Sequence, residues 1–190
     1  MTTDDAVRQI MDSLDDRVEI ARRVAQLGLP DCWIGAGFVR NAVWDALHRH
    51  PRPTPLNDVD VVYHDRADTS YASEAALAAL VHRDFPSERF SFRNQARMHH
   101  RNGHPPYSSS ADAISQWTET CTAVAVAWTG SSFDVLAPHG LDDLFALVVR
   151  PTSPDIELGR LVARRVEEKK WLSTWPLLRL EAPLTSPDMA

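Results

Sequence analysis

The stretches W-I-G-A-G-F-V-R-N at residues 33–41 and L-N-D-V-D-V-V at residues 56–62 decide the fold expected for this chain. The first stretch predicts a short apolar strand, a glycine turn and the first turn of a helix. The second predicts a strand in which valines flank Asp58 and Asp60. Residues two positions apart on a strand project from the same face, so we expect the two carboxylates to lie side by side.

These two stretches together indicate a metal site beside a phosphate site. Two adjacent carboxylates repel each other unless a cation lies between them, and the cation that prefers a few oxygens plus substrate phosphate is Mg²⁺, with Mn²⁺ as the alternative. Gly35 and Gly37 allow a close approach of a phosphate to the backbone, and the following helix N-terminus favours an anion. Arg40 is placed to pair either with a triphosphate or with Asp58 or Asp60. The combination predicts phosphoryl or nucleotidyl transfer.

The order of expected elements predicts an α+β fold with a mixed sheet covered by helices. We expect helices over 4–27, 38–49, 73–82, 112–117, 140–148 and 155–171, strands over 32–34, 58–62, 89–93, 120–128 and 133–136, and an irregular loop over 95–110. The 190 residues suit a single domain, with an N-terminal helix in 1–30, a catalytic core in 31–150 and a C-terminal helix in 151–180 packed on that core.

Composition limits the compartment and the partners. A content of 44% hydrophobic and 24% charged residues indicates a folded protein, and no apolar run reaches the roughly 20 residues that span a bilayer. Cys32 and Cys121 have neither metal-ligand spacing nor a disulfide framework, so we expect two buried thiols in the cytoplasm. The net charge of −6 disfavours non-specific binding to DNA.

A polar run at residues 94–99, N-Q-A-R-M-H, is a second candidate for ligand contacts. Asn94 and Gln95 are able to bind a base or ribose edge, and Arg97 to balance phosphate charge. The alternative for Asn94 is a hydrogen-bonded loop anchor. The histidines at 99, 100 and 104 lack the spacing of a zinc site.

Four motifs in order now support a family resemblance. G-F-V-R-N-x-V-W-D at 37–45, N-D-V-D-V-V at 57–62, N-Q-A-R-M-H at 94–99 and A-P-x-G-L-D-D-L-F at 137–145 resemble a small bacterial and fungal nucleotidyltransferase-like family, formerly a domain of unknown function, of the DNA polymerase beta-like superfamily. The first two are also similar to the G-G-x-V-R-D and D-x-D segments of tRNA CCA-adding enzymes. Ala36 replaces the first glycine of that pattern and Asn41 replaces its aspartate. The resemblance spans about residues 33–175.

The resemblance implies a minimal polymerase beta-like core and a third carboxylate on a neighbouring strand in an h-[D/E]-h pattern. Asp134, in F-D-V at 133–135, has that form, although a solvated hairpin residue is the alternative. Asp58, Asp60 and Asp134 would then be the catalytic and metal-binding residues. Gly35, Gly37, Arg40, Asn94, Gln95 and Arg97 would bind the nucleotide.

The expected activity is therefore Mg²⁺-dependent transfer of a nucleotidyl group from a nucleoside triphosphate to a hydroxyl, with release of pyrophosphate. The alternative is a catalytically inactive nucleotide-binding or partner-binding module of the same fold, such as an antitoxin-like protein. For the acceptor, a small molecule or protein is favoured over long nucleic acid, since no separate acceptor-binding domain is evident. The base, the acceptor and the oligomeric state stay open at this point.

Overall fold

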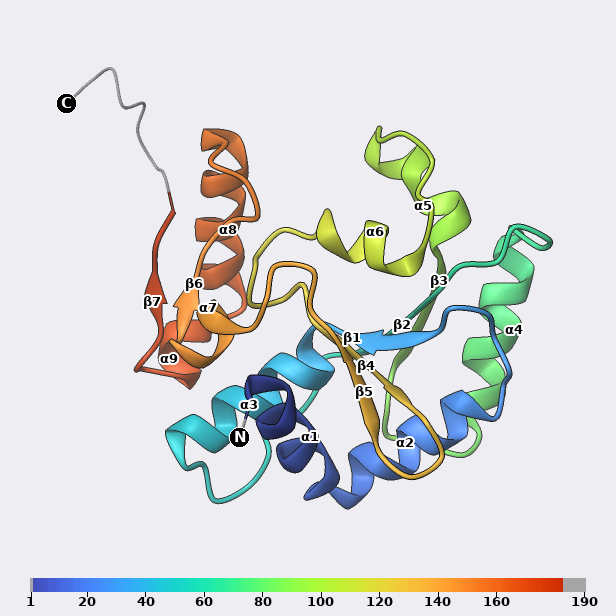
Figure 1. Ribbon diagram of the computed structural model, residues 1–190, viewed down its shortest axis with the longest axis horizontal. Helices are drawn as coiled ribbons and strands as arrows, with labels where there is room; N and C mark the ends of the chain where they lie inside the picture. The colour runs from blue at the N-terminus through green and yellow to red at the C-terminus, as the bar shows by residue number, and fades with distance from the viewer. Residues whose placement is uncertain (1, 183–190) are drawn as a thin grey trace.

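The structure is a computed structural model that describes residues 2–182 and contains a five-stranded mixed sheet with helices on both faces (Figure 1). The strand order is β3-β2-β1-β4-β5. β2 and β3 are parallel, and the other neighbouring pairs are antiparallel. The strands are β1 (Trp33–Gly35), β2 (Val59–Tyr63), β3 (Phe90–Asn94), β4 (Ala125–Trp128) and β5 (Phe133–Leu136). This arrangement confirms the predicted α+β class.

Nine helices lie within the part of the chain that the structure describes. They are α1 (Thr3–Asp12), α2 (Asp15–Ala25), α3 (Gly37–His48), α4 (Tyr71–His82), α5 (Gln95–Asn102), α6 (Ser110–Ser115), α7 (Asp142–Phe145), α8 (Ile156–Glu168) and α9 (Trp171–Thr174). Side-chain caps begin several of them: Thr2 accepts from the backbone of Asp5, and Asp155 from that of Leu158. None of the helices in 2–182 is long and apolar enough to span a membrane.

The main hydrophobic core lies between the sheet and helices α1, α2 and α3, which Figure 1 shows below the strands. Alternating residues of the strands face these helices, including Val59, Val61, Ile34 and Val126, which are almost completely buried. The opposite face carries a smaller cluster around Val62 that α6 covers. The first face is thus filled by core side chains, and polar groups of the second face remain available to a ligand.

The C-terminal segment packs against α3 rather than against the sheet. The ring of Trp44 lies 5.5 Å from that of Trp171 and 5.0 Å from that of Trp175, both in edge-to-face geometry. The indole N–H of Trp175 donates to the carboxylate of Asp45 at 2.8 Å. A short parallel pair, β6 (Val148–Val149) and β7 (Arg179–Leu180), completes this side. These contacts fix α8 beside the sheet face that carries the polar groups.

Several boundaries differ from those predicted. The helix expected over 4–27 is two helices, because Leu14 has an extended backbone and the acidic Asp15 and Asp16 begin a new helix. Residues 95–102 form α5 instead of a loop, capped by Asn94 at its start and by Gly103, with φ of 69°, at its end. The strand expected over 120–128 begins only at Ala125, and the helix expected over 140–148 is the single turn of α7.

Both cysteines are free; Cys121 is buried as predicted, whereas Cys32 is half-buried. Burial raises the pKa of both the Cys32 and the Cys121 thiols to about 12. Both therefore stay protonated at neutral pH, and neither has the character of a reactive nucleophile.

Candidate active site

A cavity of about 470 Å³ opens on the sheet face opposite the main core. Its inner end is formed by Ala36 at the start of α3, Asp60 on β2 and Thr122 before β4. Residues of α5 line one wall and residues of α8 the other, and Figure 1 shows these two helices on either side of α6. The ring of Trp117, which follows α6, also faces the cavity. The site is therefore assembled from five separate parts of the chain.

The two aspartates of the N-D-V-D-V-V stretch border two different hollows. Asp60 lies on β2 and lines the cavity, whereas Asp58 precedes the strand, is exposed, and lines a groove of about 460 Å³ between α4 and β3. Arg93 on β3 lines both hollows. The carboxylate pair thus occupies the boundary between the cavity and the groove.

Asp60 is the most strongly perturbed carboxylate among the described residues. Burial and then the negative charge of Asp58 raise the pKa of Asp60 to about 6, and the charges of Lys169 and Arg40 act in the opposite direction. The negative charge of Asp58 thus disfavours the ionisation of Asp60. The effect of Lys169, the exposed residue that ends α8, places a cation on the same side of the molecule.

The start of α3 has the properties of an anion site. Ala36, the N-cap residue, has φ of 54° and ψ of −124°, a conformation that side-chain-bearing residues rarely adopt, and it offers no side-chain cap. Its carbonyl accepts from the N–H groups of Val39 and Arg40, while those of Gly37 and Phe38 have no acceptor in residues 2–182. Phe38 is fully buried, so the N–H of the half-buried Gly37 is the backbone donor that this end of the twelve-residue helix leaves for a ligand.

The glycines of the turn have different neighbours. A Cβ at Gly35 would lie 2.6 Å from the ring of Trp117, so close packing of that ring explains this glycine. A Cβ at Gly37 would meet only ordinary contacts, the nearest being Arg40 Nη2 at 3.5 Å. Packing therefore requires glycine at position 35 but not at position 37.

Arg40 is buried and does not form an ion pair with either aspartate. One guanidinium nitrogen donates to the hydroxyl of Thr122 at 2.8 Å and another to the side-chain oxygen of Asn41 at 2.9 Å. The group also lies 4.3 Å from the ring centroid of Trp171. In this packing the Arg40 guanidinium is not placed for direct contact with a triphosphate.

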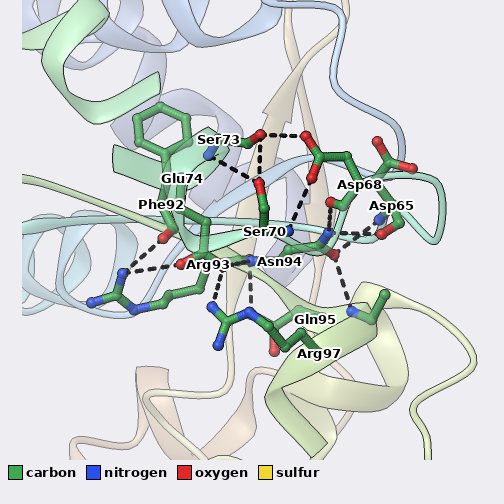
Figure 2. Close-up of polar contacts among 11 residues, drawn as sticks. Asp65, Asp68, Ser70, Ser73, Glu74, Phe92, Arg93, Asn94, Gln95 and Arg97 are labelled. Carbon is green, nitrogen blue, oxygen red and sulfur yellow. Dashed lines mark hydrogen bonds and ion pairs between the residues drawn. The ribbon is translucent and has the colours of Figure 1, made fainter. Parts of the chain in front are cut away.

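The polar run at residues 94–99 is largely satisfied within the protein. The Asn94 side chain accepts from the backbone N–H groups of Asp65 and Ala96 and donates to the carbonyls of Asp65 and Asp68. Figure 2 shows this network at the end of β3. Asn94 thus has the geometry of the loop-anchor alternative.

Glu74 on α4 is the centre of the same network, as Figure 2 also shows. It is only 3% exposed and accepts from the N–H of Asn94 at 2.8 Å and from Arg97 at 2.5 Å. Arg97 also lies over the exposed ring of Tyr71 at 3.6 Å. Of the predicted nucleotide-binding residues in this run, only Gln95 lines the cavity.

Asp134 is not brought to the carboxylate pair. It is exposed on β5, which is separated from β2 by β1 and β4, a distance of about 14 Å at the usual strand spacing. Within residues 2–182, no three His, Cys, Asp or Glu side chains are grouped as metal ligands. The expected convergence of Asp134 with Asp58 and Asp60 is therefore absent, and the position matches the solvated hairpin alternative.

Most of the residues that line the cavity were not selected from the sequence, and three of them are polar or aromatic groups suited to contact a ligand. Thr122 forms part of the inner end, and Trp117 and Arg165 form parts of the walls. Arg165 Nε donates to the fully buried Glu119 at 2.6 Å. They belong to segments far from the G-A-G turn, and the sequence pattern around them does not distinguish them from core residues.

The fold and two comparisons with known proteins identify the class of this protein, a nucleotidyltransferase domain. A solved structure described as a CCA-adding enzyme head domain is 31% identical, covers 93% of this chain and 94% of its own, and has a TM-score of 0.80. The nucleotidyltransferase family model matches residues 22–180, so the chain belongs to the nucleotidyltransferase family and is a transferase enzyme. No protein of curated function matches the sequence.

Two longer enzymes share the fold alone. A CCA-adding enzyme in complex with CTP is 13% identical over 85% of this chain, with a TM-score of 0.53. A tRNA nucleotidyltransferase in complex with a primer tRNA and an ATP analogue is 19% identical over 85%, with a TM-score of 0.50. This chain spans 38% and 46% of their respective lengths.

Proposed function

We propose that this protein transfers a nucleotidyl group from a nucleoside triphosphate to a hydroxyl acceptor, with Mg²⁺ as cofactor and pyrophosphate as the second product. The observation that carries the proposal is the position of the Asp58–Asp60 pair, beside a cavity whose inner end is the start of α3. Acidic oxygens for a metal and backbone donors for phosphate are the two requirements of this reaction class.

The donor set supports Mg²⁺, or Mn²⁺ as its substitute. Both ligands are carboxylates, and burial together with the negative charge of Asp58 raises the pKa of Asp60, a cost of ionisation that a bound cation would offset. A Mg²⁺ site in a protein commonly has one or two carboxylates and takes its other oxygens from water and substrate phosphates. Asp58 and Asp60 satisfy that pattern without a third protein ligand, so Asp134 has no place in the proposed site.

The phosphates would occupy the inner end of the cavity. The free N–H group of Gly37 is suited to donate to a phosphate oxygen, and the helix dipole of α3 adds a favourable field. Lys169 and Arg165 add positive charge from α8. The nucleoside would extend along the cavity, where Gln95 offers an amide and Trp117 an aromatic ring.

The reaction would depend on positioning and charge neutralisation. When bound, Mg²⁺ would supply activation of the attacking hydroxyl and stabilisation of the leaving pyrophosphate. Asp60 must be ionised to hold it, so binding should weaken as the pH falls through about 6. Asp60 is half-buried at the cavity, so its electrostatic contacts with a bound substrate would be stronger there than in bulk water.

The acceptor would approach from the groove that Asp58 borders. With the nucleotide in the cavity, this groove reaches the carboxylate pair from the other side, and Arg89 and Arg93 line it. Its volume of about 460 Å³ and the net charge of −6 favour a small molecule or a protein side chain as the acceptor over long nucleic acid.

The proposal is tested by transfer of label. The parent protein, Mg²⁺ or Mn²⁺, and each of the four α-³²P-labelled ribonucleoside triphosphates are incubated with fractionated cell extract. We expect one fraction to become labelled with the parent and not with the Asp58→Asn, Asp60→Asn variant. Equal labelling by the variant would exclude the carboxylate pair as the catalytic centre.

A further inference from the structure

Arg40 is a buried cation with no carboxylate partner. It is 6% exposed, and none of the ion pairs formed among residues 2–182 includes it. Its Nε has no hydrogen-bond partner, and its other contacts are with Thr122, Asn41 and two indole rings. Buried charges are usually paired, so the positive field of Arg40 indicates a nearby place for an anion.

Thr122 is the one contact of Arg40 that also faces the cavity. A threonine hydroxyl has one proton to donate, and a guanidinium has no acceptor, so the hydroxyl must use a lone pair towards Arg40 and direct its proton elsewhere. Besides Arg40, the side-chain partner of this hydroxyl is the Cys121 sulfur. The neighbouring Cys121 is a neutral thiol, which is a weak acceptor. The proton is therefore available to a group in the cavity.

We propose that the Thr122 hydroxyl donates a hydrogen bond to the triphosphate of the bound nucleotide, and that Arg40 is the positioning residue that fixes the orientation of this hydroxyl. The inference rests on the proposed function, because it assumes that phosphates occupy the inner end of the cavity. Arg40 would then act on the phosphates indirectly, through the Thr122 hydroxyl. It would neither contact a phosphate nor bridge to the aspartates.

The first test compares Thr122→Val, which keeps the shape and removes the hydroxyl, with Thr122→Ser, which keeps the hydroxyl. Calorimetry measures binding of Mg²⁺-tripolyphosphate, Mg²⁺-ATP and Mg²⁺-CTP. A hydrogen bond to a charged group predicts affinity loss on the order of 10- to 100-fold in Thr122→Val and little change in Thr122→Ser. Thr129→Val, an exposed hydroxyl deletion in the β4–β5 turn, is the matched control and should bind as the parent does.

A Thr122→Val protein that binds every probe as tightly as the parent would overturn the role of Thr122. Thr122→Ala gives the same comparison if the valine variant does not fold. A parent that binds no triphosphate would overturn both this inference and the proposed function. A parent that binds, with variants equal to it, would overturn the inference alone.

The second test separates positioning from structural support. Arg40→Lys is made in the parent and in Thr122→Val, and tripolyphosphate affinity is measured for each pair. We expect Arg40→Lys to weaken binding several-fold in the parent and to have no further effect in Thr122→Val, because the two residues act through one hydroxyl. Equal losses in both backgrounds, or a lower melting temperature with unchanged affinity, would overturn the positioning role. Arg40→Gln repeats the test if the lysine variant does not fold.

Discussion

The inner end of the cavity and the network around Glu74 are both rich in polar side chains, yet they differ in how far their polar groups are satisfied. In the Glu74 network the Asn94 side chain makes four hydrogen bonds, and the Arg97 guanidinium contacts both the Glu74 carboxylate and the Tyr71 ring. At the inner end, Asp60 has a raised pKa and two N–H groups of α3 have no acceptor. Apart from Arg97 Nε, which has no hydrogen-bond partner, the first region is satisfied without a ligand. The second is not.

This difference separates polar groups that stabilise the fold from polar groups that serve a ligand. A buried polar group without a partner costs free energy, so a protein retains it where a ligand or the chemistry requires it. The strained backbone of Ala36 belongs to the same region, and strain of this kind concentrates at functional sites. Substitutions in the two regions should therefore change different quantities, stability in one and ligand response in the other.

The largest effect on stability is expected for Glu74→Ala. Removing this buried carboxylate leaves the Asn94 N–H and the Arg97 guanidinium without a partner, which should lower the free energy of unfolding by about 3–5 kcal/mol. Urea denaturation measures the loss. The melting-temperature increase produced by Mg²⁺ and triphosphate should be retained in the folded variant, and its disappearance would assign Glu74 to the ligand site.

The next effect is a gain in stability from Asp60→Asn that depends on pH. The pKa of Asp60 is raised from 3.8 to about 6, so between these values the native state binds more protons than the unfolded chain. The contribution of this group to stability therefore falls as the pH rises from about 4 to about 6 and stays low above that range. At pH 7.5 and without metal, Asp60→Asn should raise the free energy of unfolding by about 1–3 kcal/mol.

The control for that prediction is the same pair of proteins at pH 4. Most of the stability difference should then disappear, because the parent carboxylate is protonated in the native state and close to its titration midpoint of 3.8 in the unfolded chain. A stability difference that is the same at pH 4 and pH 7.5 would show that the ionisation of Asp60 is not its cause.

The smallest effect is expected for Ala36→Gly. Glycine adopts the observed φ of 54° and ψ of −124° without steric penalty, so relief of strain should exceed the added entropy of the unfolded chain. We expect a gain of about 1 kcal/mol in the free energy of unfolding, measured by thermal denaturation. A loss of stability would show that the backbone at this position is not strained.

Sequence patterns predicted the parts of the fold that form between residues close together in the chain. The β1–α3–β2 unit follows from apolar runs, a glycine turn and a proline-containing connection, which are all readable within about 30 residues. Helix α5 was missed because the polar composition after Asn94 resembles a loop. The signals that define it, an Asn N-cap and a Gly C-cap, were present in the sequence at Asn94 and Gly103.

The candidate site was predicted only in part because strand order is a tertiary property. Asp134 has the expected h-D-h pattern, but β4 and β1 lie between its strand and β2, and no local signal contains that information. The pairing of Arg40 with Thr122 likewise joins residues that are distant in the sequence. Asp58 and Asp60 could be found because both belong to one short stretch.

The central claim is that the Asp58–Asp60 pair binds a metal–nucleotide complex, and a thermal shift series at pH 7.5 tests it directly. The parent, Asp58→Asn with Asp60→Asn, and Asp134→Asn are each melted with Mg²⁺ or Mn²⁺ and each of the four triphosphates. The account predicts stabilisation of about 2.7 kcal/mol at a ligand concentration 100 times Kd in the parent and in Asp134→Asn. The double variant should match or exceed the parent in melting temperature without ligand and show no ligand-dependent shift. Absence of any shift in the parent, or an equal shift in the double variant, would contradict the account.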